Sequence, residues 1–205
     1  MNFLAHAYLS FDQPRVLAGN LISDFVKGKK KYVYHPTIQL GIALHRAIDQ
    51  FTDTHEITAL AKRFFAPDYR LYAGAFIDIV YDHFLANDTN AFPHEEALAG
   101  FSLKTYGQLQ PLLEELPEQF QLIFRHMRRE DWLFNYRYRE GIYNSFRGLV
   151  RRAVYLQDER PARQVFDRHY DQLRILYQQF FPGLKAFASQ RLSLLQEEAG
   201  AGPKQ

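Results

Sequence analysis

Apolar residues recur along almost the whole chain at the three- and four-residue intervals of an amphipathic α-helix. This spacing places the apolar side chains on one face of a helix and the polar side chains on the other. Alternating runs of β-branched residues, which would indicate strands, are scarce. The pattern therefore predicts an all-α protein that folds as a helical bundle.

Proline, glycine and capping residues divide this pattern into separate helices. Asp53, with Glu56 three residues later, is typical of the first turn of a helix and is expected to cap one. A break is expected near Pro182 in the last helix, because proline lacks the N–H that continues a helix. The predicted helices are 3–9, 14–26, 36–51, 57–65, 67–86, 95–106, 117–128, 139–156 and 162–195.

The composition is that of a globular protein. A chain of 205 residues with 47% hydrophobic residues can bury the core of a single domain, predicted here over 1–195 and followed by a flexible tail over 196–205. No apolar run approaches the roughly 18 residues of a membrane span, so no membrane partner is expected. The chain has no cysteine and its first residues do not resemble a secretory signal. We therefore expect a cytoplasmic protein, with no particular oligomeric state indicated.

Charge is unevenly distributed although the net charge is only +2. A run of lysines, an arginine-rich stretch over 125–174 and an acidic stretch over 88–118 stand apart. Such asymmetry can steer an acidic partner toward one face of the protein. The alternative is that these charges only form an ordinary solvated surface. No nucleic-acid-binding motif accompanies the basic residues, so nucleic acid is not an expected partner. The lysines of the run are Lys27, Lys29, Lys30 and Lys31.

Histidine and aspartate crowd into the first 83 positions, within apolar helical sequence. Imidazoles and carboxylates are costly to bury unless they are paired or bind a metal. Several of them follow an i, i+4 spacing, which places side chains on one face of a helix. The residues concerned are His6, Asp24, His45, Asp49, Asp53, Asp78, Asp82 and His83.

This mixture of carboxylates and imidazoles favours Mn²⁺ or Mg²⁺, with Fe²⁺ as a further option. Structural explanations stay open beside the metal hypothesis. Asp49 has a possible ion-pair partner in Arg46 or Arg63, and His6 has a possible role as a hydrogen-bonded core histidine. A metal-dependent hydrolase is the first functional hypothesis.

Four sequence blocks resemble the acyl carrier protein phosphodiesterase family in order and spacing: MNFLAHAYLS, GNLISDFVKG, GIALHRAIDQFTDTH and FIDIVYDHFLA. Two later segments, DWLFNYRYREGI and FRGLVRRAVYL, are similar to it less specifically. The resemblance implies an all-α, HD-domain-like enzyme. Such an enzyme needs a divalent cation, with Mn²⁺ favoured, and cleaves 4′-phosphopantetheine from holo acyl carrier protein.

The resemblance also suggests roles for individual residues, although the adjacent His-Asp pair of a standard HD domain is here the reversed pair Asp82-His83. The hypothesis assigns Arg46 to charge on the phosphoryl oxygens and the lysine run to binding the acidic carrier protein. It assigns His83 and Asp49 to orienting the attacking water or supporting the ligands. The predicted metal ligands are His6, Asp24, His45 and Asp82.

Two other functions stay open from the sequence. One is a metal phosphohydrolase acting on nucleotides or another small phosphodiester, because an HD-like metal site does not by itself determine which substrate is bound. The other is a non-catalytic helical module that binds an acidic partner, in which the buried histidines and aspartates only form hydrogen bonds.

Overall fold

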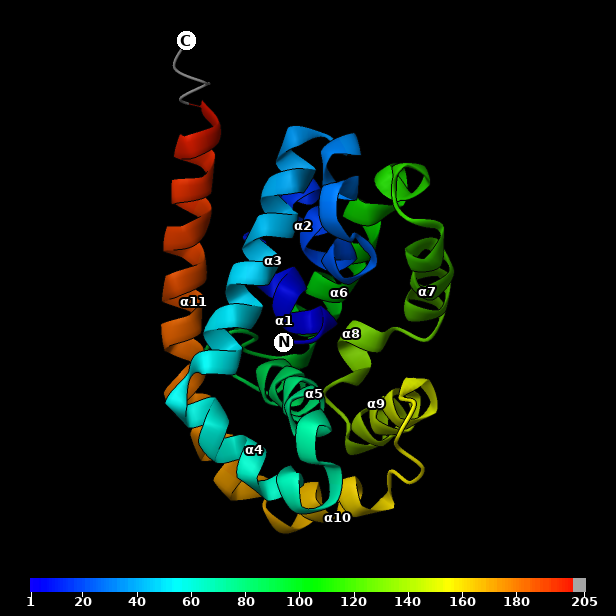
Figure 1. Ribbon diagram of the computed structural model, residues 1–205, viewed down its shortest axis with the longest axis vertical. Helices are drawn as coiled ribbons and strands as arrows, with labels where there is room; N and C mark the ends of the chain where they lie inside the picture. Colours follow the sequence, from blue (N-terminus) through cyan, green and yellow to red (C-terminus); the bar gives the residue numbers. More distant parts are fainter. Residues whose placement is uncertain (201–205) are drawn as a thin grey trace.

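The computed structural model describes residues 1–200, and within them the chain forms helices and no strands (Figure 1). The prediction of an all-α fold is confirmed. The α-helices are α1 (Phe3–Tyr8), α2 (Pro14–Ile22), α3 (Pro36–Thr54), α4 (Glu56–Tyr69), α5 (Ala73–Ala86), α6 (Glu95–Leu109), α7 (Glu118–Arg129), α8 (Trp132–Asn135), α9 (Arg139–Arg152), α10 (Arg160–Arg168) and α11 (Tyr170–Gly200). Short 3₁₀ helices join them: η1 (Ser23–Phe25), η2 (Gly28–Val33), η3 (Arg70–Tyr72) and η4 (Gln110–Glu115).

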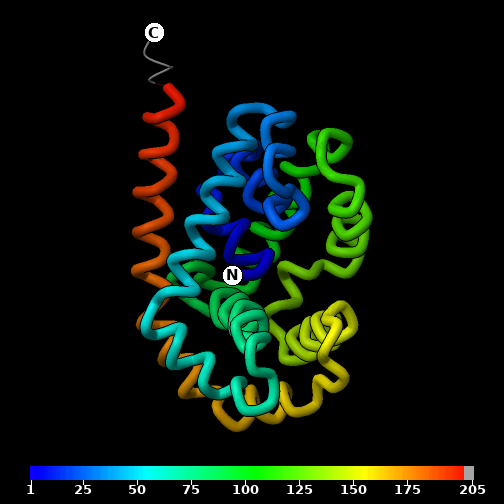
Figure 2. Tube along the Cα trace, viewed as in Figure 1, coloured from blue at the N-terminus to red at the C-terminus, as the bar shows by residue number. Residues whose placement is uncertain are grey.

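The helices form one domain around α3 and α5. Helices α2 and α11 both pack against α3, while α5 contacts α1, α4 and α9. In Figure 2 the dark-blue start of the chain lies in the middle of the molecule, beside α3, and the red end of α11 extends beyond the other helices. The short helix α1 is thus enclosed by elements that are distant from it in sequence.

Helices α2 and α3 approach each other at two glycines. A Cβ on Gly19 would lie 1.9 Å from the carbonyl oxygen of Ile38, and a Cβ on Gly41 would lie 2.1 Å from that of Val16. No other residue type fits at either position without moving the backbone. The contact matters for the candidate site because α3 carries the predicted residues His45, Arg46 and Asp49.

Two prolines that we expected to interrupt helices lie inside them. Helix α4 continues through Pro67 and ends before Arg70, which has a positive φ of 46°. Helix α11 runs without a break through Pro182, where Phe181 and Leu184 are buried in the core. A helical proline costs about 3 kcal/mol or more, and the buried apolar face of the surrounding helix offsets that cost.

Other boundaries also differ from the prediction. Asp53 does not cap α4, because α3 extends beyond it to Thr54 and the ring of His55 accepts the hydrogen bond from Ile57 N instead. The predicted helix 162–195 is two helices separated at His169. Helix α8 was not predicted, and α11 includes 196–200 of the expected tail. The rest of that tail, 201–205, lies outside the described residues.

Within residues 1–200, no helix combines the length and the apolar character that crossing a bilayer requires.

The glycine contact between α2 and α3 yields a stability prediction. Replacing Gly41 by alanine should lower the free energy of unfolding by at least about 1–3 kcal/mol, because the new Cβ overlaps the α2 backbone. Gly107→Ala is the matched control, since its Cβ would meet nothing within 4 Å and alanine favours a helix. Urea unfolding of both variants measures the effect. Equal stability of the two variants would contradict the close packing described here.

Candidate functional site

The rings of His6 and His45 stack face to face where α1 meets α3. Their centroids lie 3.9 Å apart and the rings are inclined by 14°. Both Nε2 atoms face the carboxylate of Asp49, at 3.2 Å for His6 and 3.0 Å for His45. The i, i+4 spacing of His45 and Asp49 on α3 accounts for one of these contacts, while α1 supplies the other histidine from a separate element.

Asn20 of α2 orients both imidazoles through their opposite nitrogens. Its side-chain oxygen lies 2.8 Å from Nδ1 of His6, and its main-chain oxygen lies 2.6 Å from Nδ1 of His45. Its amide nitrogen donates to the carbonyl of His6 and to Ser10 Oγ, which fixes which way the amide faces. Because both Nδ1 atoms donate a hydrogen to Asn20, the Nε2 atom of each neutral ring carries the lone pair.

Asp24 and Arg46 lie on the open side of this cluster. Asp24 Oδ1 is 3.3 Å from Nε2 of His45, and its side chain is 78% exposed. Arg46 is also exposed, and it donates one hydrogen bond to the carbonyl of Val26, just after η1. The imidazoles are buried while these two groups face solvent, so the cluster can be reached from this side.

A second cationic group contacts Asp49 from inside the protein. The α-ammonium of Met1 is fully buried, and it lies 3.1 Å from Asp49 Oδ1 and 3.1 Å from Asp78 Oδ1. Burial alone would lower its pKa, but the two carboxylates raise that pKa to about 11. The ammonium is therefore charged and is shared between α3 and α5.

The two stacked histidines differ in charge. Burial and the neighbouring charge of His45 lower the pKa of His6 to about 4, so its ring is neutral near pH 7. Burial would also lower the pKa of His45, but hydrogen bonds to Asp24 and Asp49 raise it to about 9. Burial would raise the pKa of Asp49, but the hydrogen bond from His45 and the nearby positive charge of the Met1 ammonium hold that pKa below its ordinary value.

His6, His45 and Asp49 form a donor set with the chemistry of a divalent-cation site. One ligand atom from each residue lies within 4.8 Å of the other two. Nε2 of His6 is buried and has no hydrogen-bond partner, although Asp49 is near it. A buried lone pair without a partner is costly unless it has a ligand, and two imidazoles with one carboxylate suit Mn²⁺, Fe²⁺ or Zn²⁺. These three residues fit a metal ion, and Asp24 contacts His45 from the open side.

Asp82 lies apart from this cluster. Its carboxylate accepts hydrogen bonds from the backbone N–H groups of Leu4 at 2.7 Å and Ala5 at 3.2 Å, in the first turn of α1. Burial raises the pKa of Asp82 to about 7, against the effect of these two donors. Its position is that of a support for α1, the helix that carries His6.

His83 points in a different direction from the adjacent Asp82, as the 100° rotation per helical residue requires. Its Nδ1 donates to the carbonyl of Tyr136 at 2.7 Å, and its Nε2 accepts from the hydroxyl of Tyr170 at 2.9 Å. Burial lowers the pKa of His83 to about 4. Both ring nitrogens have protein partners, and the structure does not bring His83 together with His6, His45 and Asp49.

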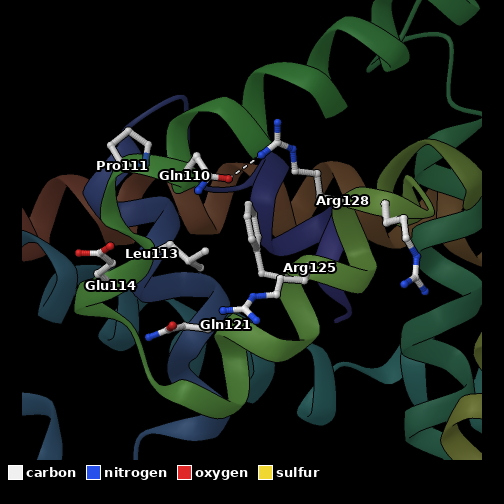
Figure 3. A pocket seen from close by; sticks show the side chains of 9 residues that line it. Gln110, Pro111, Leu113, Glu114, Gln121, Arg125 and Arg128 are labelled. Carbon is white, nitrogen blue, oxygen red and sulfur yellow. Dashed lines mark hydrogen bonds between the residues drawn. The ribbon is translucent and has the colours of Figure 1, made fainter.

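The predicted lysines lie on the segment that follows Asp24. Lys27 precedes η2, while Lys29, Lys30 and Lys31 lie within it, and all but the half-buried Lys31 are exposed. A surface hollow of about 890 Å³ lies elsewhere, between η4 and α7 (Figure 3). Arg125 and Arg128 extend from α7 and line this hollow, and Arg128 donates a hydrogen bond to the side-chain oxygen of Gln110. None of the predicted site residues lines this hollow.

Asn20 was not among the candidate residues, and Asp78 was among them but was given no role. Asn20 is fully buried between the apolar residues Gly19 and Leu21, and a polar side chain in such a run is itself a signal of a required hydrogen bond. Asp78 belongs to the acidic spacing of α5, but sequence spacing does not reveal which carboxylate faces the chain's first residue.

Fold and site together define an all-α protein with a buried histidine–aspartate cluster that opens to solvent at one side. The chain belongs to the acyl carrier protein phosphodiesterase family, whose profile matches residues 1–184. It is 34% identical to an acyl carrier protein phosphodiesterase from Photorhabdus laumondii over 182 residues, covering 89% of this chain and 92% of that protein. It is 32% identical to one from Escherichia coli over 191 residues, covering 93% and 99%.

No solved structure matches the chain. The likeness to HD domains stays a prediction for that reason.

The charge on His45 predicts a pH dependence of stability in the metal-free protein. Its pKa rises from 6.5 to about 9 on folding, so its stabilising contribution is complete below pH 6.5 and is lost as the pH rises through 9. The difference in Tm between the unmodified protein and His45→Gln, measured with a chelator present, should shrink over this interval. His126→Gln, on exposed α7 surface, is the control. A difference that widens with pH would contradict the charge assigned to His45.

Proposed function

We propose that this protein is a metal-dependent phosphodiesterase that releases 4′-phosphopantetheine from holo acyl carrier protein. The observation that carries the proposal is the meeting of His6, His45 and Asp49 in a chain whose relatives are named acyl carrier protein phosphodiesterases. The proposed site lies in the first half of the chain, within the region that matches the family.

The proposed ligands are His6, His45 and Asp49, with Asp24 completing the set from the open side. A divalent cation bound there, with Mn²⁺ favoured, would lower the pKa of a bound water and offset charge on the phosphodiester. This assignment moves Asp49 from water orientation to ligation. It leaves Asp82 and His83 as supports, because their polar atoms are occupied by backbone or tyrosine groups.

The protein's own groups supply the remaining functions. Asn20 fixes both rings with Nε2 toward Asp49, so that His6 presents a lone pair and His45 can present one when it gives up its proton. Asp24 is exposed, and its hydrogen bond to His45 lowers the pKa of its carboxylate, which keeps it ionised and able to act as a ligand. Arg46 is exposed and lies three residues before Asp49 on α3. Its guanidinium can donate hydrogen bonds to a phosphoryl oxygen.

The lysine run is proposed to bind the carrier protein. Acyl carrier proteins are acidic. A cluster of exposed lysines attracts an acidic surface within the Debye length, which is about 8 Å at physiological salt. The run begins three residues after Asp24, so a protein bound to it lies beside the open side of the cluster. This arrangement supports entry of the prosthetic group from that side.

Activity and metal dependence can be tested together. Metal-stripped protein is incubated with holo acyl carrier protein, with and without Mn²⁺, and the substrate is analysed by intact mass. We expect a Mn²⁺-dependent loss of one phosphopantetheine. Asp49→Asn should lower the rate more than about 100-fold, beyond the 10- to 100-fold typical of a residue that only supports a ligand.

Asp53→Asn is the matched control for this experiment, because Asp53 lies one turn along α3, is exposed and pairs with Lys62. It should keep full activity. Loss of the prosthetic group without Mn²⁺, or cleavage of free nucleotides in its place, would contradict the proposal.

Docking makes a separate kinetic prediction. The double variant Lys29→Glu, Lys30→Glu should raise KM for the carrier protein with little change in kcat, because the charges act on association rather than on chemistry. The rise should shrink as salt is added. Arg168→Glu, on exposed surface of α10, is the control. An unchanged KM in the lysine variant would remove the run from the docking surface.

A further inference from the structure

The buried ammonium of Met1 joins two carboxylates that belong to different helices. Asp49 lies on α3 and Asp78 on α5, and each places its Oδ1 atom 3.1 Å from the same nitrogen. The nitrogen has no exposed surface, whereas the two carboxylates are 35% and 29% exposed. A charge this deeply buried needs its partners, so the ammonium and the carboxylates hold one another in place.

Asp49 is the only member of this trio that also contacts the histidines. Its Oδ1 atom serves both the ammonium and Nε2 of His6, while Oδ2 faces Nε2 of His45. The orientation of the carboxylate toward the rings is therefore fixed from behind by the ammonium. Asp78 in turn shares the charge of that ammonium, which leaves Oδ1 of Asp49 incompletely neutralised.

We propose that Asp78, acting through the α-ammonium of Met1, is a positioning residue that keeps the carboxylate of Asp49 oriented and available to the metal ion. This inference rests on the proposed function, since it concerns a ligand of the proposed metal. Without the charge of Asp78, the ammonium has Asp49 as its sole counter-ion, and a cation must compete with it for that carboxylate. Asp78 itself touches neither the histidines nor the substrate.

The test measures Mn²⁺ binding to the metal-stripped full-length protein by titration calorimetry. Asp78→Asn keeps the shape of the side chain and removes its charge, and it should raise the Kd about 10- to 100-fold, as expected for a group that supports a ligand. Asp78→Glu should recover part of the affinity because it restores the charge. Asp53→Asn, the exposed acid that pairs with Lys62, should leave the Kd unchanged.

A second arm changes the ammonium itself. A Gly-Ser extension ahead of Met1 turns the buried ammonium into a neutral amide and leaves two carboxylates without their shared cation. If Asp78 acts through the ammonium, the extension and Asp78→Asn must change the Kd non-additively when combined. Additive changes in Kd would overturn the proposal. If Asp78→Asn folds poorly, Asp78→Glu takes its place, and its Kd is measured with and without the extension.

The outcomes separate this inference from the proposed function. If the unmodified protein binds Mn²⁺ and Asp78→Asn binds it equally well, the positioning role is overturned and the metal site stands. A fall in Tm for Asp78→Asn with no change in Kd would likewise reduce Asp78 to a purely structural residue. If the unmodified protein binds no Mn²⁺, both proposals are overturned.

Discussion

The geometry of the site depends on the two hydrogen bonds that Asn20 accepts. One uses its side-chain oxygen and the other its main-chain oxygen, so a single residue of α2 fixes the rings of His6 and His45. Its amide nitrogen is used as well, on the carbonyl of His6 and on Ser10. Since a buried amide is costly when any of these partners is missing, the arrangement of α1, α2 and α3 is tied to the orientation of the imidazoles.

Electrostatic balance explains why so many ionisable groups can lie together here. Two cationic groups, His45 and the ammonium of Met1, offset Asp49, Asp78 and the exposed Asp24, while His6 remains neutral. A bound divalent cation would take over part of this role by displacing the proton of His45. The proton of His45 is therefore a positive charge that a divalent cation could replace, which suits a site that binds a metal.

The fold could be predicted from sequence further than the site could. Helical periodicity and capping residues gave most of the helices, but Pro67 and Pro182 lie inside helices because packing of the flanking apolar residues outweighs a local preference. The spacing of His45 and Asp49 correctly placed both on one helical face. Proximity of His6 to them, and the separation of Asp82 from them, depend on how α1 lies between α3 and α5, and no local pattern encodes that arrangement.

The glycine contact has a consequence for how this protein can change over time. Where α2 meets α3, main chain lies directly on main chain, with no side chain between them whose size could vary. Elsewhere in the core, apolar side chains can exchange for others of similar volume with modest loss of stability. Sequence drift can therefore alter most of the interior, while the distance between the carbonyl of Asn20 and the ring of His45 is inherited with the two glycines.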